Sequence, residues 1–419
     1  MSIIVQKYGG SSLASSSQIR QVAKLIAERQ KTGGQLCIVV SAMGKKTNEL
    51  LGLAHEITKH PSRRELDMLL SCGERISMAL LAMALNELNV PSVSLTGSQS
   101  GIITNDVHSG ACIIEVRPER VLEGLKKNKV VIVAGFQGVS RQKEITTLGR
   151  GGSDATAVAL TAALGAEACE IYSDVDGIYS ADPRVVDDVR HIGEISHDEM
   201  LALSHSGAKV LNSQAIEWAK FKGIEIRARK TGDLSRQTRI IPENQDQKPL
   251  IKAITAQERL FCFSFECPSS LLKLIEALKE LHICPSQLLG SPDGYCLIAP
   301  EDAHGLERLN LDQLKGIRRL PDCSSLSIIG NNISLHMETT HQIVSELRSL
   351  GVRILGITNS KSRLILLLNL TIFTKQFVIY IKEFYLNELL STQCICFKCQ
   401  CQKCHRSSGC QIGQAHSIR

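Results

Sequence analysis

The sequence predicts an α/β protein: a three-layer αβα sandwich with a mostly parallel sheet, followed by smaller α+β repeats. Through residue 229, short apolar strand-like runs alternate with segments of helical periodicity, which is the pattern of a parallel sheet covered on both faces. Residues 231–249 are polar and lack an apolar period, so they mark the best boundary between the two regions. Beyond this boundary an apolar pattern recurs at an offset of 69 residues, which indicates two copies of one small unit.

Length and composition limit the classes of protein to consider. The chain has 419 residues, of which 43% are hydrophobic, enough for two or three domains with buried cores. Aromatic residues make up only 4%, and the net charge of +6 is spread along the chain, so we expect no nucleic-acid partner. An uninterrupted run of about 18 apolar residues, the signature of a membrane span, is absent. The first residues resemble a strand rather than a signal peptide, and nine of the 15 cysteines are scattered singly, as in a reducing cytoplasm.

Local apolar spacing predicts each element of the sandwich. The first strand, residues 3–7, leads into a glycine turn, and one of the serines at 15–17 can cap the helix that follows. Proline is favourable in a first helical turn, so a helix is predicted from Pro118. The remaining strands are predicted at residues 36–40, 93–95, 112–116, 130–134, 169–172 and 225–229. The remaining helices are predicted at residues 47–59, 65–89 with an interruption at 71–73, 155–164, 197–204 and 208–221.

The most informative stretch is Ile-Thr-Thr-Leu-Gly-Arg-Gly-Gly-Ser-Asp, residues 145–154. Glycines let backbone N–H groups approach an anion, and the following helix adds the positive end of its dipole. Ser153 or Asp154 is the expected N-cap of that helix. Arg150 can grip a carboxylate and Asp154 can hold an ammonium, so an amino acid would suit the pair. A tight left-handed turn between a strand and a helix is the alternative interpretation of the glycines.

Two earlier motifs also suit ligand binding. Lys7 lies at the end of a strand and is followed by Gly9, Gly10 and Ser11, so a point charge stands beside free amides, as in phosphate sites. The alternative for Lys7 is an edge lysine that keeps a strand from aggregating. Glu74 stands where an apolar helix face resumes, and it could bind a ligand ammonium. The alternative for Glu74 is a helix-start carboxylate favoured by the dipole.

A polar loop follows the strand at 169–172, at the carboxyl end where open α/β sheets bind ligands. Its tyrosine could face a nucleotide and its arginine could contact phosphate, with ordinary turn chemistry as the alternative. A lysine near the start of the helix predicted at 208–221 is disfavoured by the dipole, which indicates a phosphate partner. The candidates in this part of the chain are Ser173, Asp174, Tyr179, Arg184 and Lys209.

In the C-terminal repeat, each half is predicted to form a strand, a helix and two further strands, over about residues 252–300 and 326–370. The positions from Leu274 to Ile283 align with those from Ile343 to Val352. Binding or regulation is the natural role of such units, with structural dimerisation as the alternative. In the last 26 residues, two CxxC pairs lie one residue apart, too close for an ordinary zinc ribbon. We therefore expect a disordered extension and no metal site there.

Together and in this order, these motifs resemble the aspartate kinases of the amino-acid kinase superfamily. The resemblance covers roughly the first 240 residues closely and, as paired ACT-type modules, most of the next 130. It rests on Lys7-Tyr-Gly-Gly-Ser-Ser12, the segment from Val40 to Thr47, Cys72-Gly-Glu-Arg75, Gly135-Phe-Gln-Gly138, residues 145–154, Ser173-Asp174, Asp182-Pro-Arg184 and Gly207-Ala-Lys-Val-Leu211.

The resemblance implies transfer of the ATP γ-phosphoryl group to the β-carboxylate of L-aspartate, the first step toward lysine, threonine, methionine and diaminopimelate. It implies that Lys7 bridges the transferring phosphoryl group and that Asp154 orders Lys7 and the substrate. The implied substrate contacts are Ser41, Thr47, Glu74, Arg150, Gly151, Gly152 and Ser153. The implied nucleotide contacts are Lys7, Gly9, Gly10, Ser11, Ser173, Asp174, Tyr179, Arg184 and Lys209. Mg²⁺ is expected to arrive with ATP, held mostly by phosphates and water.

The implied organisation is a catalytic domain at residues 1–245, ACT-like modules at 250–322 and 323–390, and a cysteine-rich tail at 391–419. The resemblance also implies a cytoplasmic homo-oligomer with lysine or threonine as a feedback effector. Two alternatives stay open: a kinase for another acid such as N-acetylglutamate, and a catalytically silent amino-acid sensor. One departure stands out, because Asn212-Ser213 replaces the His-Pro usual in relatives, which could alter the support of the nucleotide pocket.

Overall fold

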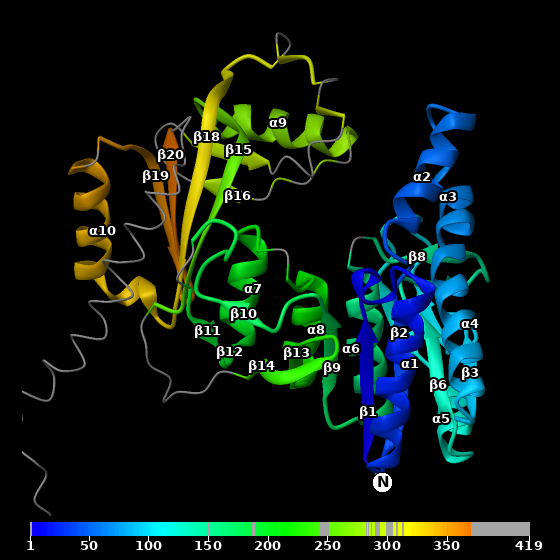
Figure 1. Ribbon diagram of the computed structural model, residues 1–419. Helices are drawn as coiled ribbons and strands as arrows, with labels where there is room; N and C mark the ends of the chain where they lie inside the picture. Colours follow the sequence, from blue (N-terminus) through cyan, green and yellow to red (C-terminus); the bar gives the residue numbers. More distant parts are fainter. Residues whose placement is uncertain are drawn as a thin grey trace, which may run out of the picture.

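The computed structural model describes residues 2–369, except 150, 187–188, 209, 243–250, 350 and parts of the segment 282–313 (282, 284, 286, 290–293, 299–304, 307–308 and 312–313). The predictions for Arg150, Lys209 and the cysteine-rich tail therefore lie outside the described residues. Figure 1 shows two sheet-based parts, an N-terminal part around an eight-stranded sheet and a C-terminal part around a six-stranded sheet.

The eight-stranded sheet is mostly parallel, as predicted. All neighbouring strands are parallel except β13 and β14, which form an antiparallel pair. The strand order is β12 (Glu194–Ser196), β14 (Asp233–Ile241), β13 (Ile226–Lys230), β9 (Cys169–Ser173), β1 (Ile3–Tyr8), β2 (Gln35–Val40), β6 (Val130–Ala134) and β3 (Ser92–Leu95).

Residues 231–249, the predicted domain boundary, contain a strand that was not predicted. Strand β14 occupies residues 233–241 and pairs with both β13 and β12. Its first four residues are exposed, and only Thr238 and Ile240 are buried. The buried alternation is therefore confined to Thr238 and Ile240, which is too short a pattern to predict a strand.

Helices cover both faces of this sheet and form two apolar clusters. One cluster takes side chains such as Ile4 and Ile38 from the strands and packs them against helices α1 and α4. The other takes the alternate positions, such as Val5 and Val39, and packs them against α5, α6, α7 and α8. Because successive strand residues point to opposite faces, these clusters are the two interlayers of the predicted αβα sandwich. The helices are α1 (Ser16–Lys31), α4 (Cys72–Glu87), α5 (Glu119–Lys126), α6 (Gly152–Leu164), α7 (His197–His205) and α8 (Ser213–Lys222).

A second, four-stranded sheet lies beside the first and was not predicted. Its order is β5 (Ile113–Val116), β4 (Ile102–Thr104), β7 (Gln137–Ser140) and β8 (Ile145–Thr147). Three of its strands have three or four residues whose apolar character is weak, so periodicity could not identify them. A short pair, β10 (Ile178–Tyr179) and β11 (His191–Ile192), and a 3-10 turn, η1 (Gly10–Leu13), complete the connections near the site.

Helix α2 (Lys46–Ile57) is followed by α3 (Arg63–Leu70), which continues almost directly into α4. Within the described residues, the run Arg63–Glu87 is long and apolar enough to cross a membrane by length and composition alone. Its side chains Met78, Leu81 and Leu85 are buried against the sheet. Core helices of globular proteins share these properties, and the packing here places α4 among them.

The six-stranded sheet is built from two copies of one unit. Its order is β16 (Gln287–Leu289), β17 (Tyr295–Ile298), β15 (Ala253–Phe265), β18 (Ile317–Ile329), β20 (Arg363–Asn369) and β19 (Arg353–Ser360), all antiparallel. Helices α9 (Pro268–Glu280) and α10 (Met337–Ser349) belong to the first and second copy. Helix α9 buries Leu274 and Leu278, and α10 buries Ile343 and Leu347, the positions that the 69-residue offset pairs.

The two sheets are joined by buried polar contacts. Lys252 Nζ lies 2.9 Å from Glu199 Oε2, and both side chains are almost fully buried. Thr255 Oγ1 donates to the carbonyl of Ser206 at 3.3 Å, and Arg363 Nη1 donates to the Ser206 hydroxyl at 3.2 Å. Ser206 follows the end of α7, so the C-terminal sheet contacts the segment that leads to residues 207–211.

Candidate active site

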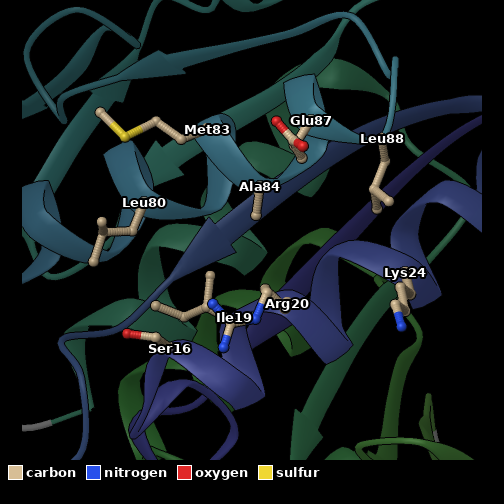
Figure 2. Close-up of a pocket in the computed structure, with 9 residues that line it drawn as sticks. All are labelled: Ser16, Ile19, Arg20, Lys24, Leu80, Met83, Ala84, Glu87 and Leu88. Carbon is tan, nitrogen blue, oxygen red and sulfur yellow. The ribbon is translucent and has the colours of Figure 1, made fainter.

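A groove of about 320 Å³ lies between α1 and α4 (Figure 2). It is lined by apolar side chains such as Leu80 and Met83, with Arg20, Lys24 and Glu87 beside them. Its lining residues include none of the predicted site residues. Several of the predicted residues, including Lys7, Ser41 and Asp174, instead lie at or just after the carboxyl ends of β1, β2 and β9.

Lys7 and Asp154 form the centre of the site. Lys7 Nζ lies 2.6 Å from Asp154 Oδ1, and the two side chains are only 12% and 9% exposed. The alternative of an edge lysine is wrong, because β1 lies between β2 and β9 in the middle of the sheet. A partly buried ion pair is screened less than one on the surface, so Asp154 holds the Lys7 side chain in one place.

The turn after β1 brings backbone close to Lys7. A Cβ built on Gly9 would lie 3.7 Å from Lys7 Nζ, so the bare glycine leaves the ammonium accessible. A Cβ on Gly10 would lie 2.9 Å from the carbonyl oxygen of Ala42, closer than real contacts allow. Ser11 Oγ approaches Asp174 Oδ1 at 3.5 Å, which joins this turn to the loop after β9. Five predicted nucleotide contacts, Lys7, Gly9, Gly10, Ser11 and Asp174, therefore meet at the carboxyl ends of β1 and β9.

The central glycine stretch leads into α6, whose first turn places Asp154 beside Lys7. Gly151 is the N-cap of α6, with a left-handed φ of 74° and no side-chain capping bond. The prediction that Ser153 or Asp154 would cap the helix is therefore wrong, because both lie inside its first turn. This placement leaves the Asp154 carboxylate to pair with Lys7. The Ser153 hydroxyl instead packs against Gly135, where a Cβ would approach it within 2.8 Å.

Glu74, in the first turn of α4, is a buried carboxylate beside the end of β2, and it is only 3% exposed. The backbone N–H of Ala42 donates to its Oε1 at 3.1 Å, whereas Oε2 has no hydrogen-bond partner among the described residues. Burial raises the pKa of Glu74 to about 7. A buried carboxylate oxygen without a partner is costly unless a cation arrives, so this side chain is suited to an ammonium group.

The neighbouring Ser41 lies at the same strand end, where its carbonyl accepts a hydrogen bond from Ser77 Oγ at 2.7 Å. Its backbone N–H donates to the carbonyl of Tyr8 at 3.1 Å, so the ends of β1 and β2 are tied together. Thr47 lies on α2, half-buried, and no described contact joins it to the other predicted substrate residues.

The outer part of the predicted nucleotide loop is only loosely connected. Ser173 bonds locally to Val175, and the Tyr179 hydroxyl donates to Asp176 at 2.7 Å. Arg184 pairs with Asp182, and its side chain is 85% exposed. The hydrogen bond to Asp182 raises the pKa of Arg184.

The structure also corrects the helix predicted at residues 208–221. Helix α8 begins only at Ser213, and the Asn212 side chain caps it by accepting from the N–H of Ala215 at 3.1 Å. The dipole argument for Lys209 therefore no longer applies, because that residue precedes the helix by several positions.

Asn212 was missed as a site residue. A Cβ on Gly151 would lie 2.5 Å from the Cβ of Asn212, so this side chain packs directly against the glycine stretch. Its position beside the Gly-Ala-Lys motif was the only signal in the sequence. The departure at this position therefore touches the central glycine stretch.

Comparison with known proteins places the N-terminal part in one family. The family model described as "Amino acid kinase family" matches residues 2–229. The aspartokinase of Geobacillus stearothermophilus is 48% identical over 261 residues, which make up 62% of this chain and 64% of that protein. The match thus spans slightly less than two thirds of that relative. The aspartokinase of Corynebacterium efficiens is 37% identical over 390 residues, covering 88% of this chain and 92% of the relative.

Among solved structures, E. coli aspartokinase III is similar in fold. Its complex with aspartate and ADP superposes with a TM-score of 0.75 at 23% identity, over 87% of this chain and 96% of that one. Its complex with lysine and aspartate gives a TM-score of 0.73 at 23% identity, over 91% of this chain and 99% of that one. These matches extend over the C-terminal sheet, so both parts of the fold are shared.

Proposed function

This chain belongs to the amino acid kinase family and, within it, to the aspartokinases, and from that premise we propose that it is an aspartate kinase. The reaction transfers the γ-phosphoryl group of ATP to the β-carboxylate of L-aspartate and gives 4-phospho-L-aspartate. The observation that carries the proposal is the buried pair of Lys7 and Asp154, set between a glycine turn and a glycine-rich helix start.

The main obstacle to this reaction is charge repulsion, since a carboxylate must approach a triphosphate. Catalysis then depends on positioning and on charge neutralisation. Lys7 would bridge the two anions, and Asp154 would hold its ammonium in place. No general base is required, because the substrate carboxylate is already ionised at neutral pH. A silent sensor would have no need of a buried lysine beside the phosphate-binding turn.

The amino-acid side of the site would recognise aspartate by its charged groups. Glu74 Oε2, which has no hydrogen-bond partner among the described residues, would accept a hydrogen bond from the substrate ammonium. Ser41, Thr47, Gly151, Gly152 and Ser153 would surround the substrate, and Arg150 would hold its α-carboxylate. An N-acetylated substrate carries no ammonium, so the buried Glu74 carboxylate favours a free amino acid over N-acetylglutamate.

The nucleotide would lie across the turn after β1 and the loop after β9. Gly9, Gly10 and Ser11 would cradle phosphates, and Ser173, Asp174, Tyr179, Arg184 and Lys209 would line the rest. The described residues contain no group of three or more side chains suited to hold a metal ion. Mg²⁺ would therefore be held chiefly by the phosphates and water, where it neutralises phosphate charge.

The C-terminal sheet would be the regulatory part. We assign a catalytic domain to residues 1–245 and two ACT-like modules to 250–322 and 323–390, with the cysteine-rich tail at 391–419 outside them. Lysine or threonine is the proposed effector, and a cytoplasmic homo-oligomer is the proposed assembly. These assignments rest on the resemblance and on the repeated strand-helix-strand-strand unit.

A hydroxylamine-trapping assay for acyl phosphate tests the proposal. Full-length protein with ATP and Mg²⁺ should yield aspartyl hydroxamate from L-aspartate and no product from N-acetylglutamate. Lysine and threonine, added separately, should show which of them inhibits. Product from N-acetylglutamate, or no product from any amino acid, would refute the proposed activity.

A further inference from the structure

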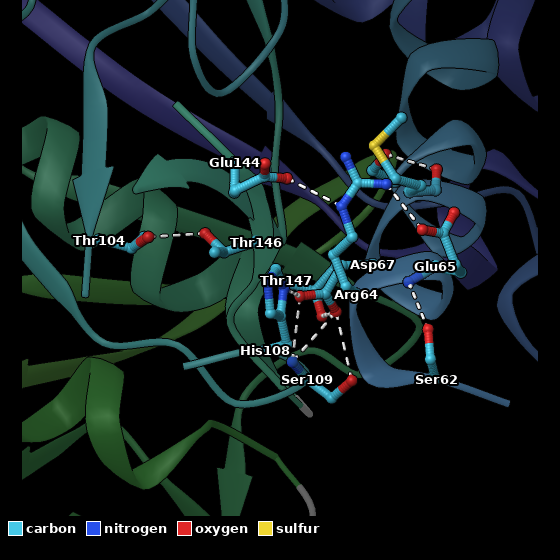
Figure 3. Close-up of polar contacts among 12 residues, drawn as sticks. Ser62, Arg64, Glu65, Asp67, Thr104, His108, Ser109, Glu144, Thr146 and Thr147 are labelled. Carbon is cyan, nitrogen blue, oxygen red and sulfur yellow. Dashed lines mark hydrogen bonds and ion pairs between the residues drawn. The ribbon is translucent and has the colours of Figure 1, made fainter. Parts of the chain in front are cut away.

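Asp67 is a fully buried carboxylate that has no part in the contacts proposed above. It lies on α3 with a relative exposure of 0%. Its Oδ1 accepts from Thr147 Oγ1 at 2.5 Å, and its Oδ2 lies 2.8 Å from His108 Nδ1 (Figure 3). The backbone N–H of Ser109 lies 3.1 Å from both oxygens, and the Ser109 hydroxyl donates at 3.3 Å.

These donors come from two segments that are distant in sequence from α3. Thr147 is the last residue of β8, immediately before the glycine stretch that begins α6. His108 and Ser109 belong to the turn between β4 and β5, where Ser109 adopts a left-handed φ of 63°. The single side chain of Asp67 therefore connects the end of β8 with the turn between β4 and β5.

The turn at 108–110 lies directly against the glycine stretch. The N–H of Ala111 donates to the carbonyl of Thr147 at 2.9 Å. A Cβ on Gly149 would lie 3.7 Å from the Cα of Gly110 and 4.0 Å from the carbonyl of Ser109. Gly149 thus lies between Thr147, two residues before it in the chain, and the turn at 108–110, which packs against it. Both Thr147 and this turn are hydrogen-bonded to Asp67.

Packing alone does not explain a carboxyl group at this place. A carboxylate without solvent is costly to bury, and an apolar residue would fill the same volume. The hydroxyl, amide and imidazole groups around Asp67 are arranged to satisfy it, which fixes their mutual geometry more tightly than apolar contacts would.

We propose that Asp67 is a positioning residue for the amino-acid side of the site, acting through Thr147 and the turn at 108–110 on the glycine stretch that starts α6. The inference rests on the proposed function for its kinetic readout. Through Leu148 and Gly149 the effect reaches Gly151, the N-cap of α6. The nucleotide turn at Gly9 and Gly10 belongs to β1 and is not attached to Asp67.

The test compares Asp67→Asn and Thr147→Val with a matched control, Thr146→Val. Thr146 is the preceding residue of β8, is equally buried, and shares a hydrogen bond of 2.6 Å with Thr104 instead of Asp67. The KM for L-aspartate should rise about 10- to 100-fold in Asp67→Asn and Thr147→Val, because small displacements of positioned groups cost that much. The KM for ATP should change less than about twofold, and Thr146→Val should leave both near wild type.

Two further measurements separate positioning from general damage. Thr147→Ser keeps the hydroxyl and should restore the KM for L-aspartate, and the double variant Asp67→Asn/Thr147→Val should be no worse than either single one. Amide hydrogen exchange at residues 148–152 should accelerate in Asp67→Asn and Thr147→Val but not in Thr146→Val. The exchange result stands even if the protein proves inactive on aspartate, which would refute the proposed function alone. Equal KM effects in Thr147→Val and Thr146→Val, or unchanged exchange at 148–152 in Asp67→Asn, would overturn the inference.

Discussion

Glu74 should make the protein less stable above pH 7 than at low pH. Burial raises its pKa from 4.5 to about 7. Below pH 4.5 the carboxyl is protonated in both the folded and the unfolded state, so burial carries no charge penalty. As the pH rises through about 7, the folded state must hold a buried carboxylate that the unfolded state exposes to water. At about 1.4 kcal/mol for each pKa unit, the free energy of unfolding falls by roughly 3 kcal/mol over this range.

Glu74→Gln keeps the shape and removes the charge. The variant should therefore be more stable than wild type by about 1–3 kcal/mol at pH 8 and by less than about 1 kcal/mol at pH 5, measured by urea unfolding without ligands. Its KM for L-aspartate should rise about 10- to 100-fold, because an ionic hydrogen bond to the ammonium is lost. In wild type, the same KM should fall as the pH rises from 6 to 8.

Glu87→Gln is the matched control, because Glu87 is an exposed glutamate on the same helix. It should change neither the stability difference between pH 5 and pH 8 nor the KM. If Glu74→Gln lowered the free energy of unfolding equally at both pH values, the argument from the buried charge would be refuted.

Three further variants test other parts of the structure. Lys7→Ala should lower kcat about 100- to 1000-fold, and it should lower stability because Asp154 loses its ion-pair partner. The double variant Lys7→Ala/Asp154→Asn should regain stability but not turnover. Recovered turnover would remove Lys7 from the mechanism. Gly10→Ala should raise the KM for ATP, since its Cβ would meet the Ala42 carbonyl at 2.9 Å, while Gly52→Ala, which meets nothing within 4 Å, should leave that KM unchanged. Lys252→Met should cost about 3–5 kcal/mol in urea unfolding, because it leaves the Glu199 charge buried and unpaired. Lys220→Met removes an exposed pair with Asp198 and should cost less than about 1 kcal/mol; similar losses in both variants would contradict the distinction.

Periodicity was informative wherever an element has a long, one-sided apolar pattern. Helix α1 shows this, because Ile19, Val22, Ala23 and Ile26 are spaced for one face and all are buried. The repeat in the C-terminal part was visible for the same reason, since α9 and α10 bury equivalent positions. The glycine turns near Lys7 and Asp154 were also identifiable, because backbone that approaches so closely excludes a Cβ.

Elements defined by long-range pairing were not identifiable. Strand β8 has three residues, Ile-Thr-Thr, and is a strand only because β7 lies beside it. Strand β14 presents mostly polar side chains and depends on β12 and β13 as partners. The N-cap of α6 was misassigned because side-chain propensity favours Ser153 or Asp154, whereas the left-handed Gly151 starts the helix earlier. Asp67 carried no signal in the sequence, since its partners are 41 and 80 residues away.

Ser206 lies where the two sheets touch, and it accepts from Thr255 on one strand and Arg363 on another. The next residue, Gly207, is wedged against the side chain of Gln257 with no room for a Cβ. A contact packed this closely is not a flexible linker between the two parts. Any rotation of the C-terminal sheet must either break these hydrogen bonds or move residues 206–208 with it. The C-terminal part and the segment that follows α7 are therefore mechanically coupled.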